Sequence, residues 1–152
     1  MIRTALLAIA ALALAGSLAC SAQEKGYWTA GGTNALAITG DIAIADTRIS
    51  INYAGFPLSQ IRALTAAELS AAFDADPGTP GNGHLYRLNV PAEKRFLHKN
   101  TLCGTEDTQW MATYVSGRTL QVDFFSGSNP PVLTFEALSN TANLCGTFTY
   151  GR

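Results

Sequence analysis

Three cysteines, Cys20, Cys103 and Cys145, are the first residues whose type and spacing point to chemistry. Cys103 and Cys145 each occur in a Leu-Cys-Gly-Thr tetrapeptide, at residues 102–105 and 144–147. Their spacing differs from the C-x-x-C of redox-active pairs. In an oxidising compartment we predict a structural disulfide between them, on two neighbouring strands. Closure of a loop of about 43 residues would stabilise the fold by roughly 4 kcal/mol.

The chain has two histidines, His84 and His98, and neither lies in a catalytic motif. A hydrolytic triad needs an imidazole held between a nucleophile and a carboxylate. We expect His84, at the start of a strand after a glycine-rich loop, to be exposed or locally hydrogen-bonded. We expect His98 to be exposed beside Lys99. The sequence therefore identifies no catalytic residue, and a hydrolase that uses either histidine is kept as an alternative.

Acidic side chains follow no recognisable metal-binding pattern. A zinc site on the histidines would need Glu93, Glu106 or Asp107 as further ligands, at no known spacing. The loop that carries Asp74 and Asp76 lacks the spaced ligands and final glutamate of an EF-hand. We predict neither a metal site nor a cofactor-binding residue.

Asp123 is a carboxylate within a segment that alternates like a strand. Val122 and Phe124 flank it on the opposite face, so we expect the Asp123 side chain to point outward into solvent. The alternative is a barrel interior lined by Gln121, Asp123 and Thr113, which would form a polar cavity for a small ligand.

The first 22 residues have the pattern of a secretory signal peptide. Met1-Ile2-Arg3 is cationic, residues 5–15 are apolar, and small residues lead to Ala22. Cleavage after Ala22 leaves residues 23–152 as a secreted or periplasmic domain. The alternative is acylation of Cys20, which would give a membrane-anchored lipoprotein. Either outcome leaves Cys103 and Cys145 as the remaining pair.

The composition of the chain argues against nucleic acid or an anionic membrane as its partner. A net charge of −1 and a charged fraction of 14% provide no concentrated cationic surface for nucleic acid or for an anionic membrane. The apolar part of the leader is shorter than the roughly 20 residues that span a bilayer, and no second apolar run follows. We expect one domain, without a transmembrane segment after the leader, whose partner is a small ligand or a protein.

Short alternating runs broken by turn residues predict strands over most of residues 23–152. The expected extended segments are 36–38, 42–44, 49–53, 61–64, 84–90, 95–103, 109–115, 119–125, 132–135 and 144–150. One short helix is expected from Thr65 to about Phe73, because Thr65-Ala66-Ala67-Glu68 is a capping box. We predict an all-β fold, an antiparallel barrel or sandwich of about eight strands with one short helix.

Two resemblances accompany this pattern. Gly26-Tyr27-Trp28 resembles the G-x-W that opens lipocalins, which implies a calycin-like barrel with Trp28 at its closed end. From the residues alone we expect Trp28 to be simply a core residue. A second likeness is carried by the following motifs: residues 38–41, 85–88, 99–104, 124–127 and 144–150. In this order they resemble a group of small exported bacterial proteins of unknown function. This likeness implies a shared fold and paired cysteines, but no activity.

Together these features predict a non-catalytic secreted or periplasmic domain that binds a ligand or a protein partner. The first alternative is an envelope structural protein anchored by a lipid at Cys20. The second is the hydrolase that would use His84 or His98.

Overall fold

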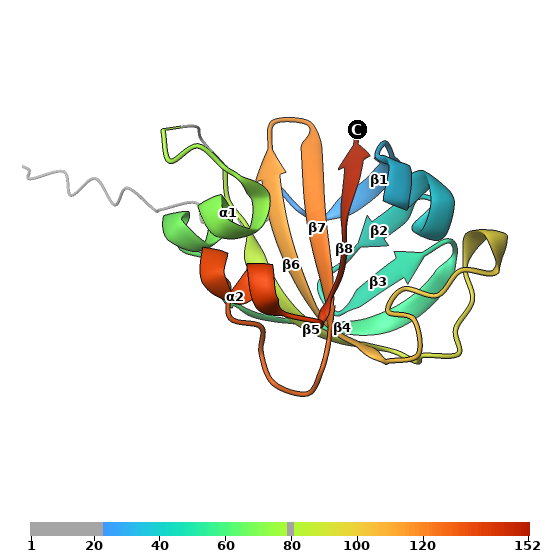
Figure 1. The fold of residues 1–152 in the computed structure, drawn as a ribbon. Coiled ribbons are helices and arrows are strands. Elements are labelled where there is room, and N and C mark those ends of the chain that lie inside the picture. Colours follow the sequence, from blue (N-terminus) through green and yellow to red (C-terminus); the bar gives the residue numbers. More distant parts are fainter. Residues whose placement is uncertain (1–22, 79–80) are drawn as a thin grey trace, which may run out of the picture.

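Alternating apolar and polar residues form strands that close into a barrel in the computed structural model, which describes residues 23–78 and 81–152 (Figure 1). The predicted signal peptide, residues 1–22, and the lipidation candidate Cys20 lie outside the described residues. The strands are β1 Gly26–Ala30, β2 Ile42–Ile44, β3 Arg48–Ile51, β4 Ala54–Ala63, β5 His84–Val90, β6 Thr108–Ser116, β7 Thr119–Ser126 and β8 Leu144–Gly151.

Each strand pairs antiparallel with the next strand in the chain, and β1 pairs with β8 to close the ring. The closing seam consists of the pairs Thr29↔Gly151 and Ala30↔Tyr150. Because the sheet is closed, every strand of the barrel has a hydrogen-bonded neighbour on both sides. The predicted fold class is confirmed in its barrel form.

A packed core fills the inside of the barrel. Trp28, Phe124 and Tyr150 have at most 1% of their surface exposed, and they belong to one cluster of inward apolar side chains. Thr113 pairs with the inward Val122, whereas Asp123 faces outward. The polar-cavity alternative is therefore wrong, because Thr113 and Asp123 lie on opposite faces of the sheet.

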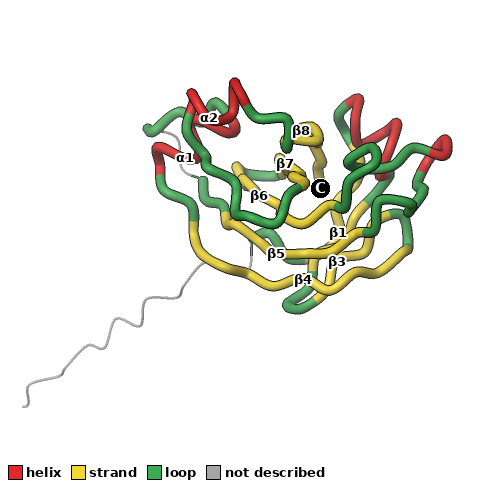
Figure 2. The backbone as a smooth tube through the Cα atoms, turned by 60° about the horizontal axis from the view of Figure 1, so that its bottom comes forward, coloured by secondary structure: helices red, strands yellow, loops and turns green. Residues whose placement is uncertain are grey.

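Two helices cover part of the outside of the barrel. α1 spans Ala66–Phe73 and α2 spans Phe135–Asn140, and both lie on the same side of the barrel in Figures 1 and 2. They enclose a second apolar cluster over β5, β6 and β7. Within it, the Phe73 ring stacks on Tyr114 with the centroids 5.9 Å apart. The predicted helix from Thr65 to Phe73 is confirmed as α1.

Three segments predicted as strands have other conformations. Residues 35–39 form a short π-helix, η1 (Ala35–Thr39), residues 97–99 form a 3-10 turn, η2 (Leu97–Lys99), and Phe135 begins α2. Ala35 and Thr39 of η1 are buried one turn apart, while Leu36 is 58% exposed. An alternation of small and aliphatic residues is too short a pattern to separate a strand from a single helical turn.

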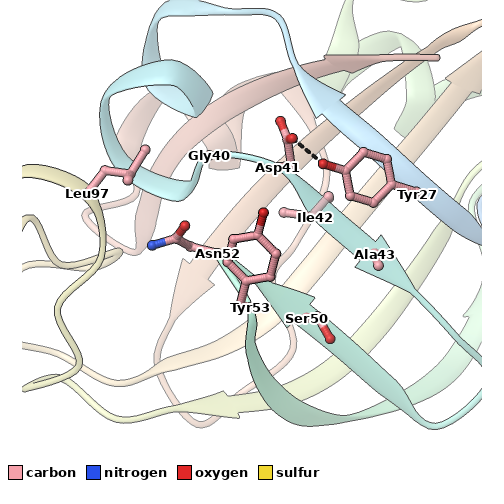
Figure 3. Close-up of a pocket in the computed structure, with 9 residues that line it drawn as sticks. All are labelled: Tyr27, Gly40, Asp41, Ile42, Ala43, Ser50, Asn52, Tyr53 and Leu97. Carbon is pink, nitrogen blue, oxygen red and sulfur yellow. Dashed lines mark hydrogen bonds between the residues drawn. The ribbon is translucent and has the colours of Figure 1, made fainter.

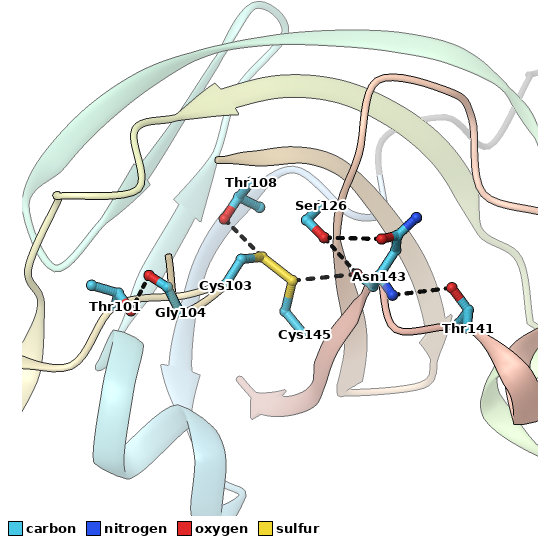
Figure 4. The surroundings of a disulfide bond; sticks show 8 residues. All are labelled: Thr101, Cys103, Gly104, Thr108, Ser126, Thr141, Asn143 and Cys145. Atoms are coloured by element: carbon cyan, nitrogen blue, oxygen red, sulfur yellow. Dashed lines mark hydrogen bonds between the residues drawn. A yellow bond between two sulfur atoms is a disulfide. The ribbon is translucent and has the colours of Figure 1, made fainter. Parts of the chain in front are cut away.

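The predicted disulfide joins Cys103 and Cys145, whose Cα atoms are 5.0 Å apart (Figure 4). Cys145 lies in β8, as expected, but Cys103 lies in an irregular loop between η2 and β6. The expectation of two bridged strands is therefore wrong at Cys103. Within residues 23–78 and 81–152, no helix combines the length and apolar character that crossing a membrane requires.

Candidate functional site

The outer face of β1, β2 and β3 contains a groove floored by small residues. Tyr27, Ala43 and Ser50 are cross-strand partners, so their side chains share the face opposite the buried Ile42 and Ile51. Because Ala43 and Ser50 are short, the surface beside Tyr27 is hollow. We name this hollow, of about 540 Å³, the tyrosine groove; its lining residues are Tyr27, Gly40, Asp41, Ile42, Ala43, Ser50, Asn52, Tyr53 and Leu97.

The first wall of the groove is the Tyr27 ring, which Asp41 holds in place (Figure 3). The Tyr27 hydroxyl donates a hydrogen bond to Oδ2 of Asp41, and the backbone N–H of Ala30 donates to Oδ1 at 2.8 Å. These two donors lower the pKa of Asp41, so its carboxyl is ionised at neutral pH. The same bond raises the pKa of Tyr27, which keeps its phenol protonated.

The second wall is Tyr53, in the two-residue turn between β3 and β4. Asn52 and Tyr53 have φ of 46° and 67°, as in a type I′ turn, and Tyr53 is 95% exposed. Glycine is the residue that this second turn position favours, because a side chain at positive φ is strained. A tyrosine that is both strained and solvent-exposed makes no evident contribution to the stability of the fold. Such strained positions are typical of functional sites.

Open hydrogen-bonding groups line the groove between the two rings. Among the residues that the structure describes, the side chains of Ser50, Asn52 and Tyr53 make no hydrogen bond. Leu97, from the η2 turn, packs beside Gly40 and ends the groove with an apolar surface. The groove therefore combines two aromatic rings with a carboxylate, an amide and hydroxyls.

His84 lies on β5 next to a buried carboxylate, away from the tyrosine groove. Its Nδ1 is 2.7 Å from Oε1 of Glu24, and the Tyr86 hydroxyl donates to Oε2 of the same carboxylate. Burial, followed by this hydrogen bond, raises the pKa of Tyr86. Glu24 is only 2% exposed, so the cluster ties the segment before β1 to the wall of the barrel. His84 is locally hydrogen-bonded, as predicted.

The hydrolase interpretation requires a histidine that meets its partners in a concave site. His84 meets a carboxylate, but no Ser or Thr hydroxyl contacts its ring in the described part of the chain, and it does not line the groove. His98 is exposed, as expected, and lies in η2 with a φ of 55°. The structure thus brings neither histidine to the groove.

Two of the acidic residues weighed in the sequence accept hydrogen bonds from backbone N–H groups. Asp107 accepts a hydrogen bond from the N–H of Ala92 at 2.8 Å, and Asp76 accepts one from Gly78 at 2.9 Å. Over residues 23–78 and 81–152, no group of three or more His, Cys, Asp or Glu side chains is arranged to hold a metal ion. Asp123 faces outward as expected, but it is only 1% exposed, so the expected contact with solvent is wrong.

Sequence reasoning did not single out any residue of the tyrosine groove as functional. The alternation of residues 49–53 predicts a strand that includes Tyr53, whereas the strand ends at Ile51 and the chain turns. The detectable signal was Asn-Tyr between two apolar runs, where Asn-Gly is the usual hairpin pair. A tyrosine in place of that glycine is the anomaly that marks the site.

Comparison with protein families, with curated proteins and with solved structures returns no match.

Proposed function

We propose that this chain is an exported, non-catalytic binding domain that recognises its ligand on the outside of the barrel, in the tyrosine groove. Buried apolar side chains fill the inside of the barrel in the described part of the chain, whereas the groove lies on its outer face. The groove volume of about 540 Å³ lies within the usual range for ligand sites, roughly 300–1,000 Å³.

Export is supported by the leader pattern of residues 1–22 and by the Cys103–Cys145 disulfide. The likeness to small exported bacterial proteins, carried in part by the two Leu-Cys-Gly-Thr segments, points the same way. Acylation at Cys20 is compatible with the same binding role and would hold the groove near a membrane surface.

The observation that carries the proposal is Tyr53. Its ring is almost fully exposed at a backbone position that suits glycine. Replacement of Tyr53 by glycine should relieve backbone strain of on the order of 1–3 kcal/mol. The greater freedom of glycine in the unfolded chain offsets about 0.5–1 kcal/mol of this, so the free energy of unfolding should rise by about 1 kcal/mol. We expect the same substitution to abolish binding. A gain in stability together with a loss of binding is typical of a residue kept for function.

The experiment compares the wild type, Tyr53→Gly and Phe135→Ser, each purified after export from bacterial cells. Phe135 is the matched control, because it is a 71% exposed aromatic residue on α2, outside the groove. Each protein is immobilised, incubated with periplasmic extract and washed, and the retained small molecules and proteins are identified by mass spectrometry.

We expect wild type and Phe135→Ser to retain the same material, and Tyr53→Gly to lose it while unfolding at higher denaturant. Either of two results would overturn the proposal: the wild type retains nothing reproducible, or Tyr53→Gly retains the same material as the wild type.

A further inference from the structure

The polar groups of the tyrosine groove are matched to a ligand with several hydroxyls. The Asn52 amide has both donors and an acceptor, and the Ser50 hydroxyl can serve as either. Asp41 uses one lone pair of each oxygen for Ala30 and Tyr27, which leaves acceptor capacity on both oxygens. Ligand hydroxyls, which donate and accept, can satisfy all three residues at once.

The two rings are matched to the apolar faces of a sugar. The face of an aromatic ring carries partial negative charge and attracts polarised C–H groups such as those of a pyranose. Tyr27 projects from β1 and Tyr53 from the β3–β4 turn, and both rings lie beside β2 (Figure 3). Flat rings above a floor of Ala43 and Ser50 leave space for a ring-shaped ligand.

Charge at the groove favours a neutral ligand over a cation. Two tyrosines and a carboxylate can also bind an alkylammonium group by cation–π attraction. However, the Asp41 carboxylate already accepts two hydrogen bonds, which spread its charge. Next to Ser50 in the floor of the groove, the Arg48 guanidinium lies over Gly55, which is the cross-strand partner of Ser50. This positive charge next to the floor would repel a cation.

We propose that the tyrosine groove is a saccharide site that binds a neutral oligosaccharide, with Tyr27 and Tyr53 stacked on sugar rings and Ser50, Asn52 and Asp41 bonded to its hydroxyls. This inference rests on the proposed function and specifies the ligand class of the same groove. The bond from Tyr27 to Asp41 holds the Tyr27 ring in place before binding, which lowers the entropic cost of ordering that ring.

The test is an NMR titration of the exported, isotope-labelled protein. The probes are neutral oligosaccharides built from glucose, N-acetylglucosamine, galactose and mannose in α and β linkages, with choline as the cationic probe. We expect at least one oligosaccharide to shift the amide signals of Ala30, Asn52 and Tyr53 in a saturable way. The signals of α1, which packs over the outer face of β5, β6 and β7 and contributes no residue to the groove, should stay in place.

Variants then assign the contacts. Tyr27→Ala and Tyr53→Gly should each weaken saccharide binding at least about tenfold, because each removes a stacked ring. Tyr27→Phe keeps the ring but loses the bond to Asp41, so its loss should be smaller. Phe135→Ser, outside the groove, should bind like the wild type.

Three outcomes would overturn the saccharide assignment: no saturable shift with any oligosaccharide, saturable binding of choline at the same amides, or saccharide binding unaffected by Tyr53→Gly. The proposed function is judged separately by the capture experiment. Capture that depends on Tyr53, without saccharide binding, removes only the ligand class; capture that does not depend on Tyr53 removes the proposed function itself.

Discussion

The Asp123 carboxyl group lies on the outer face of β7, yet only 1% of the surface of this residue is exposed to solvent. Desolvation raises the pKa of Asp123 to about 7, although the Thr147 hydroxyl, which donates to Oδ1 at 2.6 Å, opposes the shift. In the unfolded chain the same carboxyl has a pKa near 3.8. The folded state therefore binds more protons than the unfolded state between these two values.

The contribution of Asp123 to stability should consequently be greatest below pH 4 and decline as the pH rises to about 7. Asp123→Asn removes this titration while its amide oxygen can still accept from Thr147. We expect the variant to match the wild type near pH 4 and to exceed its free energy of unfolding at pH 8 by about 4 kcal/mol. Denaturant unfolding at a series of pH values measures the difference.

Thr147→Val is the companion variant, because it removes the hydroxyl that lowers the pKa of Asp123. Its loss of stability should extend to higher pH than in the wild type, while Thr147→Ser should retain the wild-type profile. Parallel stability curves for the wild type and Asp123→Asn across this range would show that Asp123 does not titrate as described.

At the scale of elements, α1 is the one helix whose beginning could be predicted. Thr65 accepts from the N–H of Glu68 at 3.2 Å, and the Glu68 carboxylate accepts from the N–H of Thr65 at 3.1 Å. This reciprocal pair satisfies two backbone donors at the start of the helix. The cap fixes the helix that carries Leu69 and Phe73 into the outer apolar cluster.

Thr65→Ala should lower the free energy of unfolding by about 1 kcal/mol, because the N–H of Glu68 loses its acceptor. Thr65→Ser keeps the hydroxyl and should cost little. Denaturant unfolding measures the stability, and amide exchange measures the opening of α1. Equal stability of the alanine and serine variants would mean that the cap does not stabilise the folded chain.

The sequence does not predict α2, because its capping and length signals are weaker than those of α1. Thr134 caps the helix by accepting from the N–H of Ala137 at 3.2 Å, but alanine at that third position cannot complete a capping box. The helix is only six residues long and follows two prolines, a context that also fits an extended segment. Leu133 beside it becomes buried only through the outer cluster on the barrel.

At the scale of the whole molecule, two links complete the closed barrel. Where β1 meets β8, the Arg152 guanidinium lies 4.1 Å from the centre of the Trp28 ring and donates to the backbone oxygen of Lys25 at 3.0 Å. The disulfide attaches the loop at Cys103 to β8, and Thr108 at the start of β6 donates to its Cys103 sulfur (Figure 4). These links join segments far apart in the sequence.

Cys103→Ser combined with Cys145→Ser should lower the free energy of unfolding by roughly 2–5 kcal/mol under oxidising conditions, because the unfolded chain regains the freedom of the closed loop. Guanidinium unfolding provides the measurement. Wild-type protein treated with reductant is the matched control and should fall to the stability of the double variant. An unchanged unfolding midpoint would contradict a stabilising bridge.

The all-β class, the cysteine pair, the α1 cap and the strand β5 could be predicted from the amino-acid sequence, since each depends on local periodicity, capping chemistry or residue count. The other features depend on contacts between segments that are distant in the sequence. The choice of a barrel over a sandwich depends on β1 meeting β8, at opposite ends of the described chain. The burial of Asp123 depends on a neighbouring strand, and the tyrosine groove depends on β1, β2, β3 and the η2 turn lying together. No local pattern encodes such long-range contacts, because each residue's neighbours in space come from distant segments of the sequence.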